Sequence, residues 1–260
     1  MRHDIAAHIT AFSTERGIVE VGNPYSSFNA NGYCGDTPQH VAECRKELCA
    51  RLGITAGHLL IPHQIHQAHV ALVTGTDADA WTPLLEGTDA LVTQQPGVCL
   101  CISTADCVPL FFYDPEHQAI GMAHAGWRGT VLGIGMHTLH TMAQAFGTQA
   151  QHVHCLIGPS IGPEAFEVGD EVYEAFSAAR FPMSDIAFRR PSSRQSGQEQ
   201  WHIDLWRANA WQLEQCGILP QHIQCCRVCT YTHHERFFSA RRLGINSGRI
   251  LNGMMIKQKS

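Results

Sequence analysis

Short apolar runs that end at turn residues dominate the middle of the chain. Three of these runs cover residues 98–103, 110–113 and 119–123, and Asp114-Pro115 separates the second run from the third. An almost wholly apolar run of this length, bounded by turn residues, is typical of a strand that is buried on both faces. Similar but weaker signals predict further strands over residues 10–13, 18–21, 87–93 and 153–157.

Helical periodicity is clearest between Thr37 and Gly53. Apolar residues recur there on one helical face, Pro38 suits the first helical position, and the flanking threonine and glycine suit the two caps. The same reasoning predicts helices over residues 131–146, 171–179 and 203–216. Residues 182–200 are mostly polar, and we expect them to form a mobile internal loop.

Composition narrows the class of protein. The 260 residues are 44% hydrophobic, which is ample for one globular unit with a packed core. The net charge of -5 argues against nucleic acid or an anionic membrane as a partner. The sequence shows neither the apolar run of a signal peptide nor an apolar span of membrane length, so we expect a cytoplasmic protein. Eleven scattered cysteines indicate reduced thiols, and seventeen histidines raise the expectation of a metal.

Residues that can bind a metal or act in catalysis lie at the ends of two predicted strands. Cys107 precedes one strand and His124 ends the next, so the two side chains can face one pocket. A thiol and an imidazole suit a soft-metal site or a Cys/His catalytic pair. Earlier in the chain, His63, His66 and His69 lie between two apolar runs. On a strand the middle histidine would face away from the other two, so at most one or two of them reach a common metal, or all three are simply solvated.

Three further groups of polar residues have two interpretations each. Asn29 lies in a Gly/Asn/Ser-rich loop that either lines a site or covers the surface. Cys226 and Cys229 have the spacing of a zinc knuckle, or they are ordinary strand residues. Arg241 and Arg242 either bind a phosphate through bidentate hydrogen bonds or form a solvated pair.

Six ordered motifs together resemble one known family. They cover residues 64–66, 104–109, 124–129, 157–162, 166–169 and 237–242. The family is that of the bacterial multicopper polyphenol oxidases, or laccase-domain proteins, whose members are also described as purine nucleoside phosphorylases with adenosine deaminase activity. The resemblance implies one α+β domain over residues 1–260, with layered mixed β-sheets flanked by helices, similar to cysteine hydrolases.

The resemblance also implies a catalytic metal site. The family's two histidines and one cysteine fall on His66, Cys107 and His124, with zinc as the expected metal and copper as the alternative. Two family tyrosines are replaced here, by Phe166 and Ala240. Residue type adds Asp106 as a candidate catalytic group and, for substrate contacts, Asn29, Arg128, Arg241 and Arg242.

The implied activity is metal-dependent phosphorolysis of purine nucleosides such as adenosine, inosine or methylthioadenosine, with adenosine deamination beside it. Two histidines and a cysteine with an open fourth position suit zinc that activates water, as deamination requires. A copper-dependent polyphenol oxidase is one alternative, although His152-Val153-His154 is the single His-x-His element. A cysteine hydrolase with Cys107 as nucleophile is the other. We expect a monomer or a weak homodimer that binds nucleoside and phosphate.

Overall fold

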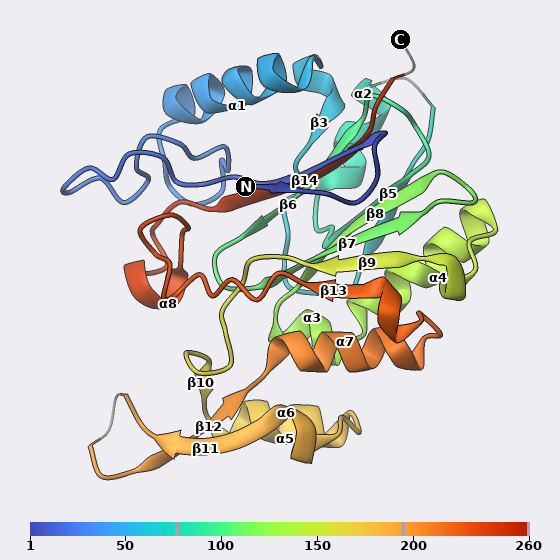
Figure 1. Cartoon of the computed structure of the whole chain (residues 1–260). Coiled ribbons are helices and arrows are strands. Elements are labelled where there is room, and N and C mark those ends of the chain that lie inside the picture. The colour runs from blue at the N-terminus through green and yellow to red at the C-terminus, as the bar shows by residue number, and fades with distance from the viewer. Residues whose placement is uncertain (76–77, 194–195, 259–260) are drawn as a thin grey trace.

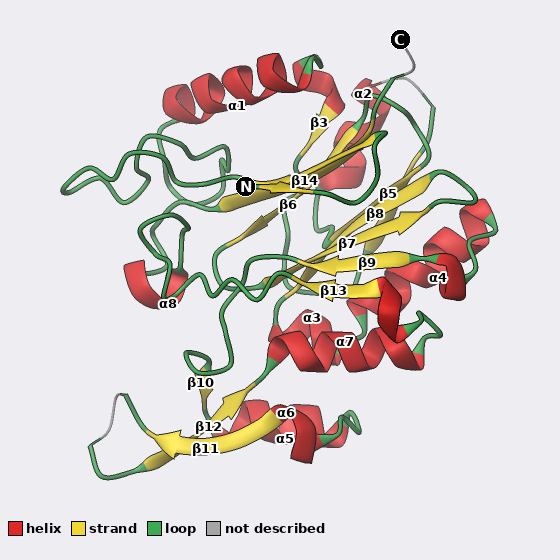
Figure 2. Cartoon of the chain, in the orientation of Figure 1, coloured by secondary structure: helices red, strands yellow, loops and turns green. Residues whose placement is uncertain are grey.

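Two β-sheets pack face to face in the computed structural model, which describes residues 1–75, 78–193 and 196–258 (Figures 1 and 2). The five-stranded sheet has the order β1 (Arg2–His3), β2 (Ile9–Ser13), β14 (Ile250–Ile256), β6 (Cys99–Thr104) and β3 (Leu59–Leu60). The six-stranded sheet has the order β13 (Ile223–Cys225), β9 (His154–Ile157), β7 (Val108–Asp114), β8 (Ala119–Ala125), β5 (Ala90–Thr93) and β4 (Val70–Val73). Both sheets mix parallel and antiparallel pairs, so the expected layered α+β fold is confirmed.

Side-chain alternation along the strands divides the core into layers. On β6, Leu100 and Ile102 belong to the cluster between the two sheets, where they join Phe111 of β7. Cys99 and Cys101 belong to the cluster on the other face of the same strand. Because successive side chains of a strand point to opposite faces, both faces of β6 are buried, as its apolar run predicts.

Helices cover the outer faces of both sheets (Figure 1). Helix α1 (Pro38–Leu52) packs on the five-stranded sheet, and α4 (Ile134–Phe146) and α7 (Leu205–Gln215) pack on the six-stranded sheet. The predicted ends of α1 are confirmed, since Thr37 caps the backbone N–H of His40 and Gly53 adopts a φ of 69°. The short helices are α2 (Ala78–Trp81), α3 (Trp127–Val131), α5 (Asp170–Ala178), α6 (Met183–Ile186) and α8 (Ala240–Leu243).

A small third sheet projects from the main body (Figure 2). It has the order β10 (Glu167–Val168), β12 (Glu199–Ile203) and β11 (Ala187–Pro191). The predicted loop is therefore wrong for residues 183–191 and 199–200, which form α6 and two strands of a β-hairpin, whereas residues 192–193 and 196–198 are loop and turn as predicted. Arg194 and Gln195, which belong to the same stretch, lie outside the described residues. The hairpin escapes prediction because its strands are half-exposed and polar, with the guanidinium of Arg189 4.5 Å from the ring centre of Trp201.

One predicted strand is absent from the structure, and a strand considered for the histidines is a loop. Residues 18–21 form no strand; Ile18 and Val19 stay exposed because no neighbouring strand pairs with them. Residues 61–69 form a loop between β3 and β4, so strand alternation does not govern the histidines there. Within the described residues, none of the helices has the length and apolar character needed to cross a membrane.

Candidate metal centre

Three side chains from separate parts of the chain converge at the ends of the two central strands, β7 and β8, of the six-stranded sheet. Val108 at the start of β7 lies opposite Ala125 at the end of β8, which places Cys107 beside His124, as their positions in the sequence predict. The loop before β4 adds His66. One ligand atom from each of the three lies within 4.8 Å of the others. His124 is buried and His66 is exposed, so the cluster lies where the core meets solvent.

Asp89, which the sequence analysis missed, holds both histidines of this cluster. Its buried carboxylate accepts hydrogen bonds from the backbone N–H groups of Ile65, His66 and Gln67, at 3.3, 3.0 and 2.9 Å. The same carboxylate lies 2.9 Å from Nδ1 of His124. The available signal in the sequence was an acidic residue directly before a buried strand, β5.

The charges of the cluster stabilise one another. Burial alone would raise the pKa of the Cys107 thiol, but the facing charges and hydrogen bonds of His124 and His66 lower it to about 6. Burial alone would lower the pKa of His124, but the Cys107 thiolate and the Asp89 carboxylate raise it to about 9. The metal-free cluster therefore holds a thiolate beside an imidazolium at neutral pH.

The donor set and its surroundings fit a metal such as zinc. Two imidazoles and a thiolate are ligands that zinc prefers, and three protein ligands leave a fourth position open. Because Asp89 binds Nδ1 of His124, Nε2 is left for the metal. A side chain on Gly126 would meet Sγ of Cys107 at 2.9 Å, so a glycine is needed to leave the thiol in its place.

Asp106 adjoins the cysteine but already has two partners in the protein. Its carboxylate accepts hydrogen bonds from the Thr230 hydroxyl and from the backbone N–H of Arg241, both at 2.7 Å. Its backbone has a φ of 89°, a conformation that non-glycine residues rarely adopt. These bonds tie the loop that carries Cys107 to the C-terminal part of the chain. A catalytic role for Asp106 stays a prediction.

The three candidate arginines differ in their surroundings. Arg241 binds the carbonyl groups of Ala165 and Glu167 through Nη1, at 3.3 and 2.9 Å, and its guanidinium lies 5.6 Å from the ring centre of Phe166. Arg128 and Arg242 are exposed. The guanidinium of Arg128 lies 4.3 Å from the ring centre of Trp127, and Arg242 contacts the Tyr231 hydroxyl at 3.3 Å. Substrate contact by these arginines stays a prediction.

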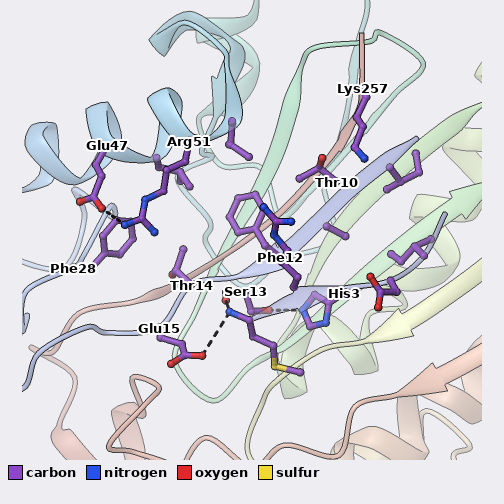
Figure 3. Close-up of a pocket in the computed structure, with 18 of the residues that line it drawn as sticks. His3, Thr10, Phe12, Ser13, Thr14, Glu15, Phe28, Glu47, Arg51 and Lys257 are labelled. Carbon is purple, nitrogen blue, oxygen red and sulfur yellow. Dashed lines mark hydrogen bonds and ion pairs between the residues drawn. The ribbon is translucent and has the colours of Figure 1, made fainter. Parts of the chain in front are cut away.

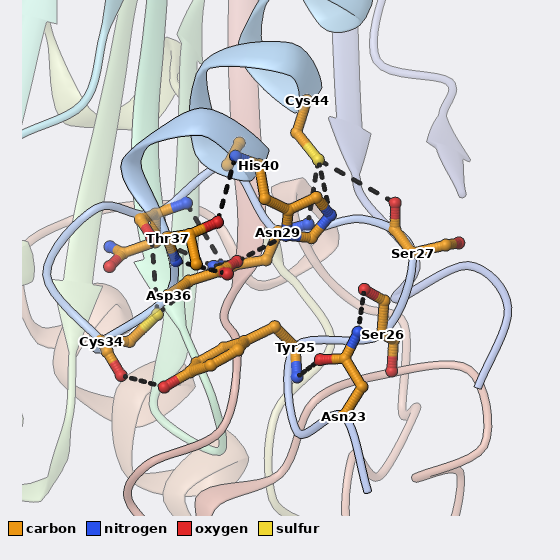
Figure 4. A network of polar contacts seen from close by, with 12 residues as sticks. Asn23, Tyr25, Ser26, Ser27, Asn29, Cys34, Asp36, Thr37, His40 and Cys44 are labelled. Carbon is orange, nitrogen blue, oxygen red and sulfur yellow. Dashed lines mark hydrogen bonds and ion pairs between the residues drawn. The ribbon is translucent and has the colours of Figure 1, made fainter. Parts of the chain in front are cut away.

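Asn29 is buried inside a network of polar contacts instead of lining an open surface (Figure 4). Its amide nitrogen donates to Asp36 at 2.8 Å, and its amide oxygen accepts the backbone N–H of Arg249 at 3.1 Å. His40 bridges Asp36 and the Cys44 thiol, at 2.7 and 3.4 Å. The network attaches the loop to α1, so the structure gives Asn29 an internal structural role. Its direct contact with substrate stays a prediction.

The remaining candidate ligands have other partners. His63 lies 2.7 Å from a Glu86 oxygen, and His69 lies 3.1 Å from the Thr88 hydroxyl. The zinc knuckle is wrong, because among residues 1–75, 78–193 and 196–258 only His66, Cys107 and His124 form a group with metal-ligand spacing. The Cys229 thiol instead accepts the backbone N–H of Gly162 at 3.1 Å.

A separate groove of about 980 Å³ lies between α1 and the first two strands (Figure 3). Apolar residues such as Phe12 and Leu48 line it together with charged residues such as Arg51 and Lys257. None of the three clustered ligands lines this groove. This groove and the cluster of His66, Cys107 and His124 are therefore in different places.

The layered fold, with a His-Cys-His cluster at the ends of two central strands, defines a class of α+β proteins with a candidate metal site. The chain belongs to the family described as multi-copper polyphenol oxidoreductase laccase, which its sequence matches over residues 9–257. This agrees with the family resemblance of the six motifs.

Named relatives and solved structures match nearly the whole chain. A purine nucleoside phosphorylase of Bacteroides thetaiotaomicron is 45% identical over 94% of this chain and 90% of its own length. The adenosine deaminase RL5, from an unknown prokaryotic organism, is 40% identical over 96% of this chain and 94% of its own length. The crystal structure of YlmD from Geobacillus stearothermophilus has a TM-score of 0.85 and 31% identity, covering 97% of this chain and 93% of that protein.

Proposed function

We propose that this protein is a metal-dependent purine nucleoside phosphorylase that also deaminates adenosine. The observation that carries the proposal is the meeting of His66, Cys107 and His124 in a chain whose relatives are named for these two activities. The proposed substrates are a purine nucleoside, such as adenosine, inosine or methylthioadenosine, with phosphate for the first reaction and water for the second.

The residues of the site have separate parts in this proposal. A zinc ion held by the three ligands would supply a Lewis acid with one open position. Copper is the alternative metal. The exposed side of His66 gives a substrate access to the cluster, while buried His124 is held from behind by Asp89. Arg128 in α3 offers an exposed cation for phosphate three residues after the end of β8, and a guanidinium suits a phosphate geometrically.

A product assay tests the proposal directly. Zinc-loaded protein is incubated with inosine, with and without phosphate, and separately with adenosine. We expect hypoxanthine and ribose 1-phosphate only when phosphate is present, and inosine from adenosine without it. Chelation should abolish both activities, zinc should restore them, and Cys107→Ser should lose them together with the metal. Fully loaded protein that releases no base in the presence of phosphate would refute the phosphorylase.

Hydrolysis by a cysteine nucleophile, Cys107, is the second candidate function, and one observation favours it. Asp89, His124 and Cys107 form a relay in which a carboxylate orients an imidazole beside a thiolate, as a nucleophilic cysteine requires. Alkylation of Cys107 in metal-free and zinc-loaded protein separates the two functions. Strong protection by zinc supports ligation, whereas equal alkylation with retained zinc supports a nucleophile.

The oxidase alternative requires more copper than one cluster of ligands holds. The described residues contain one group with metal-ligand spacing. Several equivalents of bound copper, with phenol oxidation as fast as nucleoside turnover, would reverse the order of the two proposals. Size-exclusion chromatography tests the expected monomer or weak dimer, and fractionation of the cells tests the expected cytoplasmic location.

A further inference from the structure

The carboxylate of Asp89 serves two ligands that are far apart in the sequence. Oδ1 lies 3.0 Å from the backbone nitrogen of His66 and 2.9 Å from Nδ1 of His124. Oδ2 accepts the backbone N–H groups of Ile65 and Gln67, at 3.3 and 2.9 Å. Asp89 is 0% exposed, so water does not compete for these bonds.

The backbone around His66 depends on this carboxylate. His66 has a φ of 61°, in the left-handed region that a non-glycine residue adopts at a cost. The three successive N–H groups of residues 65–67 point at one anion, an arrangement known as a nest. The negative charge of the carboxylate therefore offsets the cost of the turn that presents the His66 side chain.

We propose that Asp89 is the positioning residue of the metal centre, which fixes the turn of His66 and the ring of His124 at the same time. In the metal-bound state Nδ1 of His124 is the hydrogen-bond donor to Asp89, and Nε2 keeps its lone pair for the metal. The inference rests on the proposed metal-dependent function and adds to it the residue that sets the geometry of both histidine ligands.

An asparagine at this position cannot replace the carboxylate. If its oxygen faces His124, its NH₂ group faces the backbone N–H groups of Ile65 and Gln67, and donors meet donors. If the amide is turned over, its NH₂ group faces Nδ1 of His124 and favours the tautomer with a proton on Nε2, which cannot bind the metal. Asp89→Asn therefore damages one ligand or the other while nearly preserving the volume of the side chain.

Asp114 provides a matched control. It is also 0% exposed, its carboxylate accepts the backbone N–H groups of Glu116 and His117 at 2.9 and 3.2 Å, and it lies 2.8 Å from Nδ1 of His117. It ends β7, whereas Cys107 precedes the start of that strand. Asp114→Asn thus removes a comparable buried carboxylate at the opposite end of the strand from the metal centre.

The test measures metal binding and metal geometry in the wild type and both variants. Zinc affinity is obtained by competition with a chelator, and the visible spectrum is recorded for cobalt-substituted protein. We expect Asp89→Asn to bind zinc about 10- to 100-fold more weakly and to show a shifted cobalt spectrum. Asp114→Asn should lose thermal stability but keep both the wild-type affinity and the wild-type spectrum.

The outcomes separate this inference from the proposed function. Wild-type affinity and spectrum in Asp89→Asn, or an equal loss in both variants, overturns the role of Asp89 whatever the enzyme acts on. A wild-type protein that binds zinc tightly but does not phosphorolyse or deaminate nucleosides overturns the function and leaves the role of Asp89 intact. A wild-type protein that binds none of zinc, cobalt and copper overturns both.

Discussion

Gly126→Ala is expected to loosen the metal centre through a single methyl group. The backbone of Gly126 has φ -63° and ψ 170°, which alanine adopts without strain. The new Cβ would lie 2.9 Å from Sγ of Cys107 and 3.5 Å from Cδ2 of His66. Ordinary contact between such atoms is about 3.5–4.0 Å, so the thiol has to move by roughly 0.6–1.1 Å. Metal–ligand distances tolerate only about ±0.2 Å.

The consequence is a loss of both metal affinity and folding stability. We expect zinc to bind at least about tenfold more weakly, which corresponds to about 1.4 kcal/mol, measured by chelator competition. Overpacking should lower the free energy of unfolding by about 1–3 kcal/mol, measured in urea.

The control is Gly121→Ala. A side chain at Gly121 in β8 meets Thr138 and Val92 at 3.2 Å and Met142 at 3.3 Å, so it overpacks the core without touching a ligand. This variant should lose stability and keep its zinc affinity. If Gly126→Ala binds zinc as tightly as the wild type, the close approach of glycine and thiol does not hold the ligand in place.

Three further outcomes are expected. In metal-free protein, the rate at which iodoacetamide alkylates Cys107 should rise through pH 6. Burial raises the pKa of the thiol, but the charge and hydrogen bond of His124 outweigh that effect and lower the pKa to about 6; a rise only near pH 8 would contradict this. Asn29→Ala should lower the free energy of unfolding by about 1–3 kcal/mol, because it leaves the hydrogen-bonding groups of Asp36 and Arg249 without their partner. An unchanged KM for the nucleoside would show that the role of Asn29 is structural. Burial raises the pKa of Asp114, but hydrogen bonds from its neighbours, His117 among them, lower it below the ordinary 3.8. The stability that this carboxylate contributes is complete above pH 3.8 and is lost as the pH falls through the folded pKa. Acidification should therefore reduce the free energy of unfolding, measured in urea, less in Asp114→Asn than in the wild type. The same dependence on pH in both proteins would contradict this.

The sequence alone predicts the strands and helices whose pattern of apolar residues shows which side chains are buried. The apolar runs over residues 98–103, 110–113 and 119–123 mark strands in which every side chain is buried, and an unbroken apolar run is the signal there because other layers cover both faces of the sheet. The antiparallel turn at Asp114-Pro115 also brings the start of one strand to the end of the next. Cys107 and His124 were therefore predictable neighbours from local pattern alone.

Only the tertiary structure decides which partners complete the site. Alternation along a strand does not apply to His66, because it lies in a turn with positive φ that is held by a carboxylate 23 residues away. Asp89 gives no periodic signal, since a single buried acid is defined by the donors around it and not by its neighbours in sequence. Asn29 is buried for the same reason, through bonds to Asp36 and Arg249. Local pattern records which faces are buried, whereas long-range hydrogen bonds determine where loops place their side chains.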